Sequence, residues 1–273
     1  MLILKIGGGR EMNLTGIAGD LGSFAEPVII VHGANAWRDE LASALGREKT
    51  IITSASGYSS VLSDEPAVEL LMMAYAGLQN KRLVAACQQQ GINAVGLSGL
   101  DGRVVQGRRN SGIRIKDGDK IRVVRDLSGK PETVNTELLD LLLEKGYTPV
   151  LTMPLIDEKG VAINSENDDV VALLHQTYRA PVILQLIEAA GLLRDPEDPA
   201  SVIPRLRPVE IAGWEGQAHG RIKRKLHALG RLFQHGSPTV IIADGRREHP
   251  VRDGLAGRGT VIAEQQLPGG GVP

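Results

Sequence analysis

The sequence predicts an α/β protein in which helices cover both faces of a largely parallel sheet. Short apolar runs alternate with longer segments of helical periodicity along the 273 residues. Several of the apolar runs are continuously aliphatic, as expected of strands that are buried on both faces. Alternating strands and helices are typical of parallel strands joined by crossover helices. A chain of this length can form one large α/β domain or two modest lobes that share a sheet.

The apolar runs predict six strands, and the periodic segments predict six helices. In chain order the strands lie at residues 2–6, 27–32, 93–98, 147–152, 181–187 and 238–244. The helices lie at residues 13–25, 36–45, 65–90, 135–146, 167–178 and 216–234. Residues 102–126 break this alternation with short alternating stretches between glycine-containing turns, which predicts antiparallel hairpins that project from the main sheet. Residues 160–164 predict the return strand of a second, small hairpin.

Composition and charge exclude several classes of protein. The net charge of −1 argues against wholesale binding to nucleic acid or to a membrane. No apolar run approaches the ~18 residues of a membrane span, and the N-terminus lacks the pattern of a signal peptide. The single cysteine, Cys87, rules out an intramolecular disulfide and fits a reducing compartment. We therefore expect a cytoplasmic protein.

The first strand carries a lysine just ahead of a glycine-rich turn. Lys5 is followed, after one apolar residue, by Gly7, Gly8 and Gly9. The carboxyl ends of parallel strands line the ligand crevice, so Lys5 can hold the charge of a phosphate while backbone N–H groups bind its oxygens. A lysine that only extends from a strand end to solvent fits the same pattern, and the motif alone favours neither reading.

The second strand ends in a similar turn. The sequence VHGAN, residues 31–35, again runs from an apolar strand through small residues into a helix. Two such junctions can form two facing anion sites, which suits a phosphoryl donor and an anionic acceptor. A plain strand–turn–helix junction is the alternative.

Charged residues also gather at the starts of two later helices. Lys223, Arg224 and Lys225 follow Gly220 in the first turns of a predicted helix, where cations oppose the helix dipole unless an anionic ligand is present. Solvated surface lysines are the alternative there. In the stretch INSENDDVVALL, Asn164 and Asp168 precede an apolar helical pattern. N-capping explains most of this stretch, and a carboxylate that orients the lysines is the functional alternative.

Taken together, these pieces resemble the amino acid kinase superfamily, with the acetylglutamate kinases as the closest branch. The matching motifs are K-x-G-G at 5–8, V-H-G-x-x at 31–35, I-N-x-x-x-D at 163–168, G-L-L-R-D at 191–195 and G-R-I-K-R-K at 220–225. Three further segments look most like kinases that act on 2-aminoadipate attached to an amino-group carrier protein, in lysine biosynthesis; they are residues 74–83, 98–109 and 243–255. The resemblance extends from residue 1 to about residue 262.

The resemblance implies an αβα sandwich with a mainly parallel central sheet, as in carbamate kinase. It implies a single kinase domain over residues 1–273, in which about 1–150 bind the acyl acceptor and 151–262 bind ATP. From its own sequence, EQQLPGGGVP, the terminal segment 264–273 is expected to be a flexible tail. Related enzymes form homodimers, often through a long central helix, for which residues 65–90 are the candidate here.

The resemblance also assigns roles to individual residues. It implies that Lys5 and Lys225 stabilise the transferring phosphoryl group, that Asp168 organises them, and that Gly7 and Gly8 face the phosphates. It implies an acceptor site that includes Gly33, Ala34, Asn35, Val61 and Asn164. The implied cofactors are ATP and Mg²⁺, the latter held mainly through the phosphates, and no metal site made of protein side chains is predicted.

The implied reaction explains why a lysine and glycine turns suffice. A side-chain carboxylate attacks the γ-phosphorus of ATP and forms an acyl phosphate. Because a carboxylate is already ionised at neutral pH, no general base or covalent nucleophile is needed. Catalysis then consists of positioning and of neutralising charge on the phosphoryl oxygens.

Three residues depart from the family pattern. Val61 stands where relatives carry an arginine that grips a substrate carboxylate, and losing such a bond costs roughly 1.5–3 kcal/mol. Ala34 replaces a glycine of the second turn. Glu188 stands near the nucleotide where relatives carry a small polar residue, and an unpaired carboxylate there would repel phosphates.

The basic segment at residues 103–125 favours the carrier-dependent branch. It contains eight Arg or Lys residues against two Asp. A small acidic carrier protein would be steered by such a cationic rim, whereas free acetylglutamate would not need one. The alternative interpretation is an ordinary charged hairpin that is exposed to solvent. Two other functions stay open: an N-acetylglutamate kinase of arginine biosynthesis, and a divergent paralogue that binds nucleotide or carrier with little catalysis.

Overall fold

The computed structural model describes most of the chain, and the account below keeps to that part. The described residues are 1–47, 49–53, 59–117, 120–195, 197–217 and 220–264. Only the backbone is described at 59–60, 116–117, 120, 217 and 220–225. The predicted tail therefore lies outside the described residues from residue 265 onward.

Within this part of the chain a central sheet has eight strands, in the order β14-β16-β15-β13-β1-β2-β10-β5. In that order the strands are Arg205–Leu206, Thr260–Ile262, Thr239–Asp244, Val182–Ile187, Leu2–Ile6, Val28–His32, Thr148–Thr152 and Ala94–Ser98. All neighbours are parallel except β15 and β16. The six strands predicted from aliphatic runs are all confirmed, and they occupy the six positions from β15 to β5.

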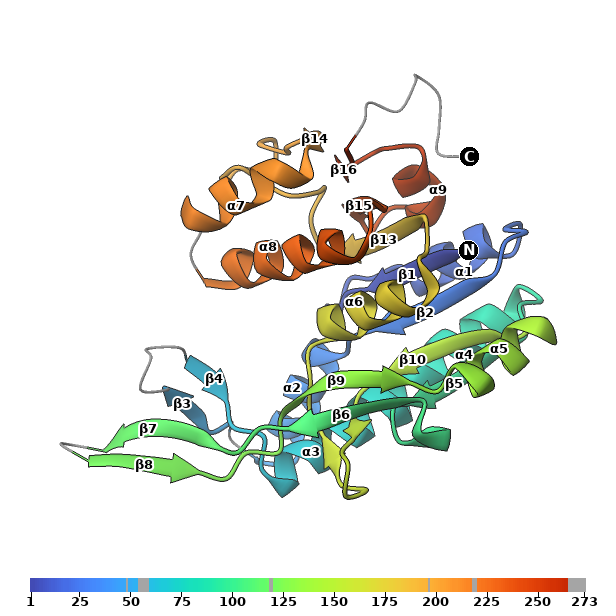
Figure 1. Ribbon diagram of the computed structural model, residues 1–273. Coiled ribbons are helices and arrows are strands. Elements are labelled where there is room, and N and C mark those ends of the chain that lie inside the picture. Colours follow the sequence, from blue (N-terminus) through green and yellow to red (C-terminus); the bar gives the residue numbers. More distant parts are fainter. Residues whose placement is uncertain (48, 54–58, 118–119, 196, 218–219, 265–273) are drawn as a thin grey trace.

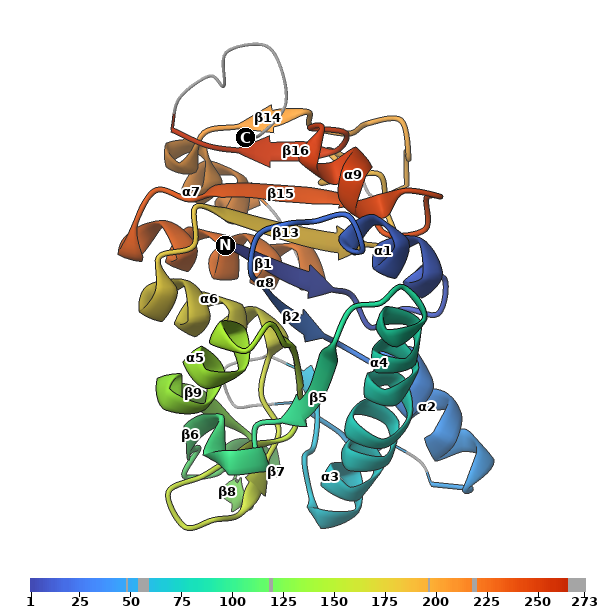
Figure 2. The same ribbon diagram turned by 90° about the vertical axis from the view of Figure 1, so that its right-hand side faces the viewer.

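Helices cover both faces of this sheet, so the predicted αβα sandwich is confirmed (Figures 1 and 2). Alternate residues of β1 point to opposite faces: Leu2, Leu4 and Ile6 belong to one buried cluster, and Ile3 belongs to the other. The first cluster includes residues of α1 (Leu14–Leu21), α4 (Asn80–Gln89) and α9 (Pro250–Leu255). The second includes residues of α5 (Thr136–Glu144), α6 (Asn167–Tyr178), α7 (Pro208–Gln217) and α8 (Gly220–Leu232).

Smaller sheets and hairpins lie beside the main sheet. A four-stranded sheet has the order β12-β11-β6-β9, made of Ala162–Ile163, Leu155–Ile156, Val105–Arg109 and Gly129–Val134. Two hairpins project at one end of the molecule, β3–β4 (Ile51–Thr53 and Ser59–Val61) and β7–β8 (Ile113–Asp117 and Lys120–Val124) (Figure 1). Within 102–126 one hairpin is confirmed, β7–β8, whereas β6 pairs with β9 beyond that range; the hairpin predicted at 160–164 is confirmed by β11–β12.

The helical predictions need two corrections. The segment 65–90 is helical throughout, but α3 (Glu65–Leu71) and α4 are separated by a π-helix, η1 (Met72–Gln79). The helix predicted at 216–234 begins at Gly220 as α8 and ends in a 3₁₀ turn, η3 (Phe233–His235), whereas α7 precedes it. The remaining predicted helices are α1, α2 (Asn35–Ala44), α5 and α6. Among the described helices, none is long and apolar enough to cross a membrane.

Candidate active site

Lys5 and Asp168 meet at the carboxyl edge of the central sheet. Lys5 lies on β1, with Val31 of β2 and Gln185 of β13 as its neighbours in register. The Lys5 ammonium donates to Asp168 Oδ1 at 2.7 Å, and the Lys5 side chain is only 11% exposed. Asp168 lies in the first turn of α6. A lysine that merely reaches for solvent would not be buried against a carboxylate, so the structural reading of Lys5 as a solvated strand end is wrong.

The two glycine-rich turns pack directly against each other. Gly33 N–H donates to the Ile6 carbonyl, and Ala36 N–H donates to the Gly8 carbonyl, both at 3.0 Å. A Cβ at Gly8 would lie 2.1 Å from Asn35 Oδ1 and 2.7 Å from the Ala34 nitrogen. Only glycine fits at this contact, because any side chain would push the turns apart. The two strand ends thus form one continuous surface beside Lys5.

Tyr75 supports the second turn from the π-helix, a role that the sequence did not indicate. Its hydroxyl donates to Asn35 Oδ1 at 3.4 Å, and the residue is 5% exposed. The pKa of Tyr75 is raised, because burial outweighs the opposing effect of the nearby Arg38 charge. The hydroxyl therefore stays protonated at neutral pH. π-Helical turns are frequent at functional sites. The shifted hydrogen bonds of a π-helix leave no mark on the residue pattern, so the sequence gives no sign of this role for Tyr75.

His32 fixes the start of the second turn through a buried polar network. Its Nδ1 lies 3.2 Å from the Gly33 carbonyl, and Asn80 Nδ2 lies 3.1 Å from its Nε2. Asn80 therefore donates to Nε2, and Nδ1 carries the proton that is donated to the carbonyl. The same amide of Asn80 donates to the Val150 carbonyl at 3.0 Å, and Thr152 Oγ1 donates to the His32 carbonyl at 3.0 Å.

This network predicts a loss of stability in acid. Burial lowers the pKa of His32 from 6.5 to about 4, so the folded protein takes up this proton less readily than the unfolded chain. The stabilisation is complete above pH 6.5 and is lost as the pH falls from there toward 4, by about 3 kcal/mol in total. Urea unfolding of the wild type and His32→Asn across that range measures it. The variant should show the shallower decline, and equal slopes would contradict the assignment.

Ser63 links Asn164 to the β3–β4 segment that contains Val61. The Asn164 amide donates to Ser63 Oγ at 3.1 Å, and its backbone N–H donates to the Leu127 carbonyl at 2.7 Å. Ser63 closely follows β4, which ends in Val61. Val61 is 36% exposed and pairs with Ile51 of β3. The structure therefore joins Asn164 to the β3–β4 segment, and Val61 presents an apolar side chain there.

The other two departures have local explanations. Ala34 is completely buried between the turns, so its methyl group is accommodated. The Glu188 carboxylate accepts from the Glu11 backbone N–H at 2.6 Å. It lies against Gly9, whose Cβ would fall 1.9 Å from Glu188 Cδ. Glu188 is therefore hydrogen-bonded to the backbone beside the first turn rather than unpaired.

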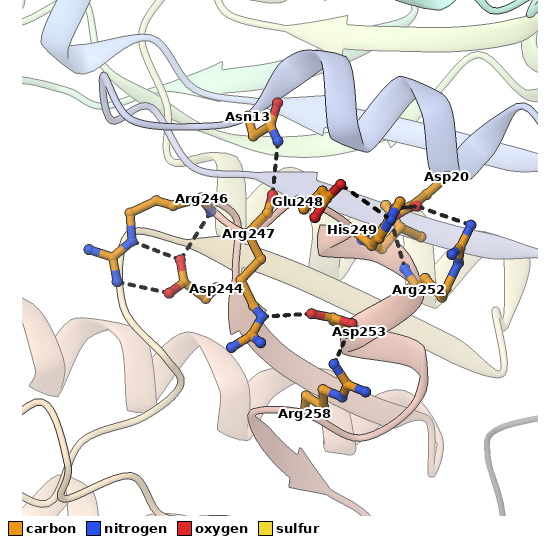
Figure 3. Close-up of polar contacts among 11 residues, drawn as sticks. Asn13, Asp20, Asp244, Arg246, Arg247, Glu248, His249, Arg252, Asp253 and Arg258 are labelled. Atoms are coloured by element: carbon orange, nitrogen blue, oxygen red, sulfur yellow. Dashed lines mark hydrogen bonds and ion pairs between the residues drawn. The ribbon is translucent and has the colours of Figure 1, made fainter.

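A cluster of arginines and carboxylates follows β15, and Asn13 links this segment to the start of α1 (Figure 3). Arg246 binds Asp244 with two hydrogen bonds of 2.8 Å, which holds the pKa of Asp244 below its usual range. Arg247 and Arg258 both donate to Asp253, at 2.6 and 2.9 Å. The Asn13 side chain donates to the Arg247 carbonyl at 2.9 Å. The arginines are therefore paired with carboxylates of their own segment, and Asn13 ties that segment to the chain between the first turn and α1.

The remaining predicted site residue is Lys225, which lies on α8, the helix that Gly220 opens. Its side chain lies outside the described part of the structure. Among the described residues, no three His, Cys, Asp or Glu side chains gather into a group that could hold a metal ion.

Known proteins resemble most of the chain. The model of the amino acid kinase family matches residues 1–244. A LysW-aminoadipate kinase of Thermus thermophilus is 38% identical over 268 residues, which cover 96% of this chain and 100% of that protein. An acetylglutamate kinase of Methanopyrus kandleri is 30% identical over 266 residues, which cover 96% of this chain and 100% of that protein.

A solved structure supports the same fold at lower identity. The carbamate kinase of Giardia superimposes with a TM-score of 0.66 and 14% identity, over 97% of this chain and 98% of that one. The resemblance based on motifs is thereby extended to the arrangement of the whole chain.

Proposed function

Because the chain belongs to the amino acid kinase family, we propose that it phosphorylates the side-chain carboxylate of carrier-linked L-2-aminoadipate in lysine biosynthesis. The kinase family implies that ATP is the phosphoryl donor. The observation that carries the substrate assignment is the 38% identity to a LysW-aminoadipate kinase over nearly the full length of both chains. The buried Lys5–Asp168 pair beside two glycine turns supplies matching chemistry.

The proposed transfer needs little more than these groups. An oxygen of the acceptor carboxylate forms a bond to the γ-phosphorus, the bond from that phosphorus to the bridging oxygen breaks, and ADP leaves. Negative charge on the transferring group is neutralised by Lys5, which Asp168 holds in place, and by backbone N–H groups of the turns. Lys225, at the start of α8, is proposed as the second cation.

Mg²⁺ is proposed to enter with ATP and to neutralise phosphate charge. The described carboxylates that border the first turn are engaged: Asp168 binds Lys5, Asp244 binds Arg246, and Glu188 accepts from Glu11. This arrangement fits an ion held mainly by the phosphates rather than by a cage of protein carboxylates.

We propose that about residues 1–150 bind the acceptor and that residues 151–262 bind the nucleotide.

The most direct test traps the product. The protein is incubated with ATP, magnesium and hydroxylamine, and the acceptor is either aminoadipate on its carrier protein or N-acetylglutamate. Hydroxamate from the loaded carrier alone supports the proposal. Hydroxamate from N-acetylglutamate instead favours an acetylglutamate kinase of arginine biosynthesis, an alternative supported by the 30% identity to such an enzyme. No hydroxamate from either, with an active homologue alongside, favours a paralogue with little catalysis.

The carrier is proposed to be a small acidic protein that docks on the basic hairpins of residues 103–125. Arg114 and Arg125 are exposed, and neither has an ion pair or hydrogen bond from its side chain within the described residues. Exposed cations attract an acidic partner over a long distance, and dissolved salt weakens this attraction.

We further propose that the protein is a cytoplasmic homodimer. Met73 and Leu78 expose apolar surface on the helical segment 65–89, which is the proposed dimer contact.

Charge reversal tests this docking. Arg114→Glu combined with Arg125→Glu should lower kcat/KM for the loaded carrier about tenfold at low salt, because it removes steering charge. The effect should shrink as salt rises. Turnover of a small free acceptor should not change. Reversing Arg205 and Lys145, which are exposed elsewhere, is the matched control. An equal loss for the control or for the free acceptor would contradict docking on the hairpins.

A further inference from the structure

Buried polar atoms without partners flank the Lys5–Asp168 pair. Among the described residues, these include Gln185 Oε1, Ser165 Oγ and Asn167 Oδ1. Gln185 lies next to Lys5 in the sheet, whereas Asn167 directly precedes Asp168 and opens α6. A buried polar atom with no partner is costly, so such atoms in a site mark places where a ligand group or an ordered water can bind.

Asn167 lies against the second turn, which the proposed function assigns to the acceptor. Its Nδ2 is 3.2 Å from the position that a Cβ of Gly33 would take, so its amide lies against the second turn. Gly33 in turn packs on Gly8, since the same Cβ would lie 3.0 Å from the Gly8 nitrogen. The amide group of Asn167, whose oxygen has no partner among the described residues, therefore lies beside the place where the two turns meet.

The chemistry of this oxygen limits what it can bind. An amide oxygen accepts hydrogen bonds, so its partner must bring an N–H or O–H group. The phosphates of ATP and the reacting carboxylate present only acceptor oxygens at neutral pH. An amino acid whose amino group is acylated presents one N–H, on the amide nitrogen. A carrier that holds its cargo by the amino group creates the same N–H.

We propose that Asn167 is a specificity-determining residue that accepts a hydrogen bond from the amide N–H of an N-acylated acceptor. This inference rests on the proposed function and deepens it, because it names the group by which the site recognises that the amino group is acylated. A free amino acid would bring an ammonium group instead, with a different geometry and charge. An ester would bring an oxygen in place of the N–H and would leave Asn167 unpartnered.

The test compares binding of an amide and an ester rather than turnover. The probes are N-acetyl-2-aminoadipate and 2-acetoxyadipate, which differ only in N–H against oxygen, and calorimetry gives the Kd of each. The wild type should prefer the amide by about 10- to 100-fold, as expected when a site built for an N–H is offered an analogue without it. Asn167→Leu should reduce that preference to about threefold or less. Asn167→Asp, which keeps an acceptor oxygen, should preserve most of it.

The controls separate this inference from the proposed function. Asn93 is an exposed asparagine just before β5, at the opposite edge of the sheet, and Asn93→Leu should keep the wild-type preference. No preference in the wild type, or an equal preference in Asn167→Leu, would overturn the role of Asn167. If Asn167→Leu does not fold, Asn167→Ala gives the same comparison. Trapped hydroxamate reports catalysis separately, so a protein that discriminates but does not phosphorylate refutes only the proposed function.

Discussion

Replacing Lys5 with methionine is expected to lower kcat by about 100- to 1,000-fold, the range seen when one preorganised donor to a developing charge is removed. Methionine keeps most of the length and apolar character of lysine, so the end of β1 can stay packed between β2 and β13. The lost group is the ammonium that lies 2.7 Å from Asp168 at the glycine turns. KM for ATP should change less than kcat, because the charge is needed most in the transition state.

A matched control makes this result specific. Lys145 is an exposed lysine at the end of α5, and Lys145→Met should leave kcat within about twofold of the wild type. Thermal unfolding checks that Lys5→Met is folded. A folded Lys5→Met variant with near-normal kcat would show that Lys5 does not act on the phosphoryl group.

The largest effect on stability is expected from Asp20→Ala. Asp20 lies on α1 with a side chain only 2% exposed, and its carboxylate accepts from the backbone N–H groups of Val251 and Arg252 at 2.9 and 3.0 Å. His249 Nδ1 lies 3.0 Å from the same carboxylate (Figure 3). Asp20 thus caps α9 and fastens it to α1. Removing it leaves the buried N–H of Val251 and the part-buried N–H of Arg252 without an acceptor, and we expect the free energy of unfolding to fall by about 2–5 kcal/mol.

Denaturant unfolding measures this effect, with Asp140→Ala as the control. Asp140 is exposed and accepts one hydrogen bond, from the Tyr178 hydroxyl at 2.9 Å. Its removal should cost under about 1 kcal/mol. Asp20→Asn, which keeps one acceptor oxygen, should fall between the two. Equal losses for Asp20→Ala and Asp140→Ala would contradict the capping role.

The sequence predicts the central sheet well because burial on both faces produces a distinctive pattern. All six aliphatic runs form strands, and the glycine after each of the first two strands marks a turn that the structure uses. The short edge strands β14 and β16 escape this approach. β14 and β16 are too short to show a period, and their pairing depends on segments more than 50 residues apart. The six residues of α9 depend on Asp20 rather than on a pattern of their own.

Some features of the candidate site can likewise be predicted from the sequence, and others cannot. Lys5 and the glycine turns can be found from local pattern, because a strand end and a close approach of backbone each leave a mark. The partnership of Lys5 with Asp168, across 163 positions of the chain, follows only from resemblance to relatives. Tyr75, Asn167 and the bond from Glu11 to Glu188 depend on contacts between distant segments. Unpartnered atoms in particular cannot be read from a sequence, because they are defined by what surrounds them.

The central claim is that this chain transfers a phosphoryl group to a carboxylate on a carrier protein. The intact mass of aminoadipate-loaded carrier, after incubation with the protein and magnesium-ATP, tests it most directly. The account predicts a gain of one phosphoryl group that hydroxylamine removes, with none on unloaded carrier and little from Lys5→Met. A loaded carrier that gains no such group, while a known homologue adds one under the same conditions, would contradict the claim.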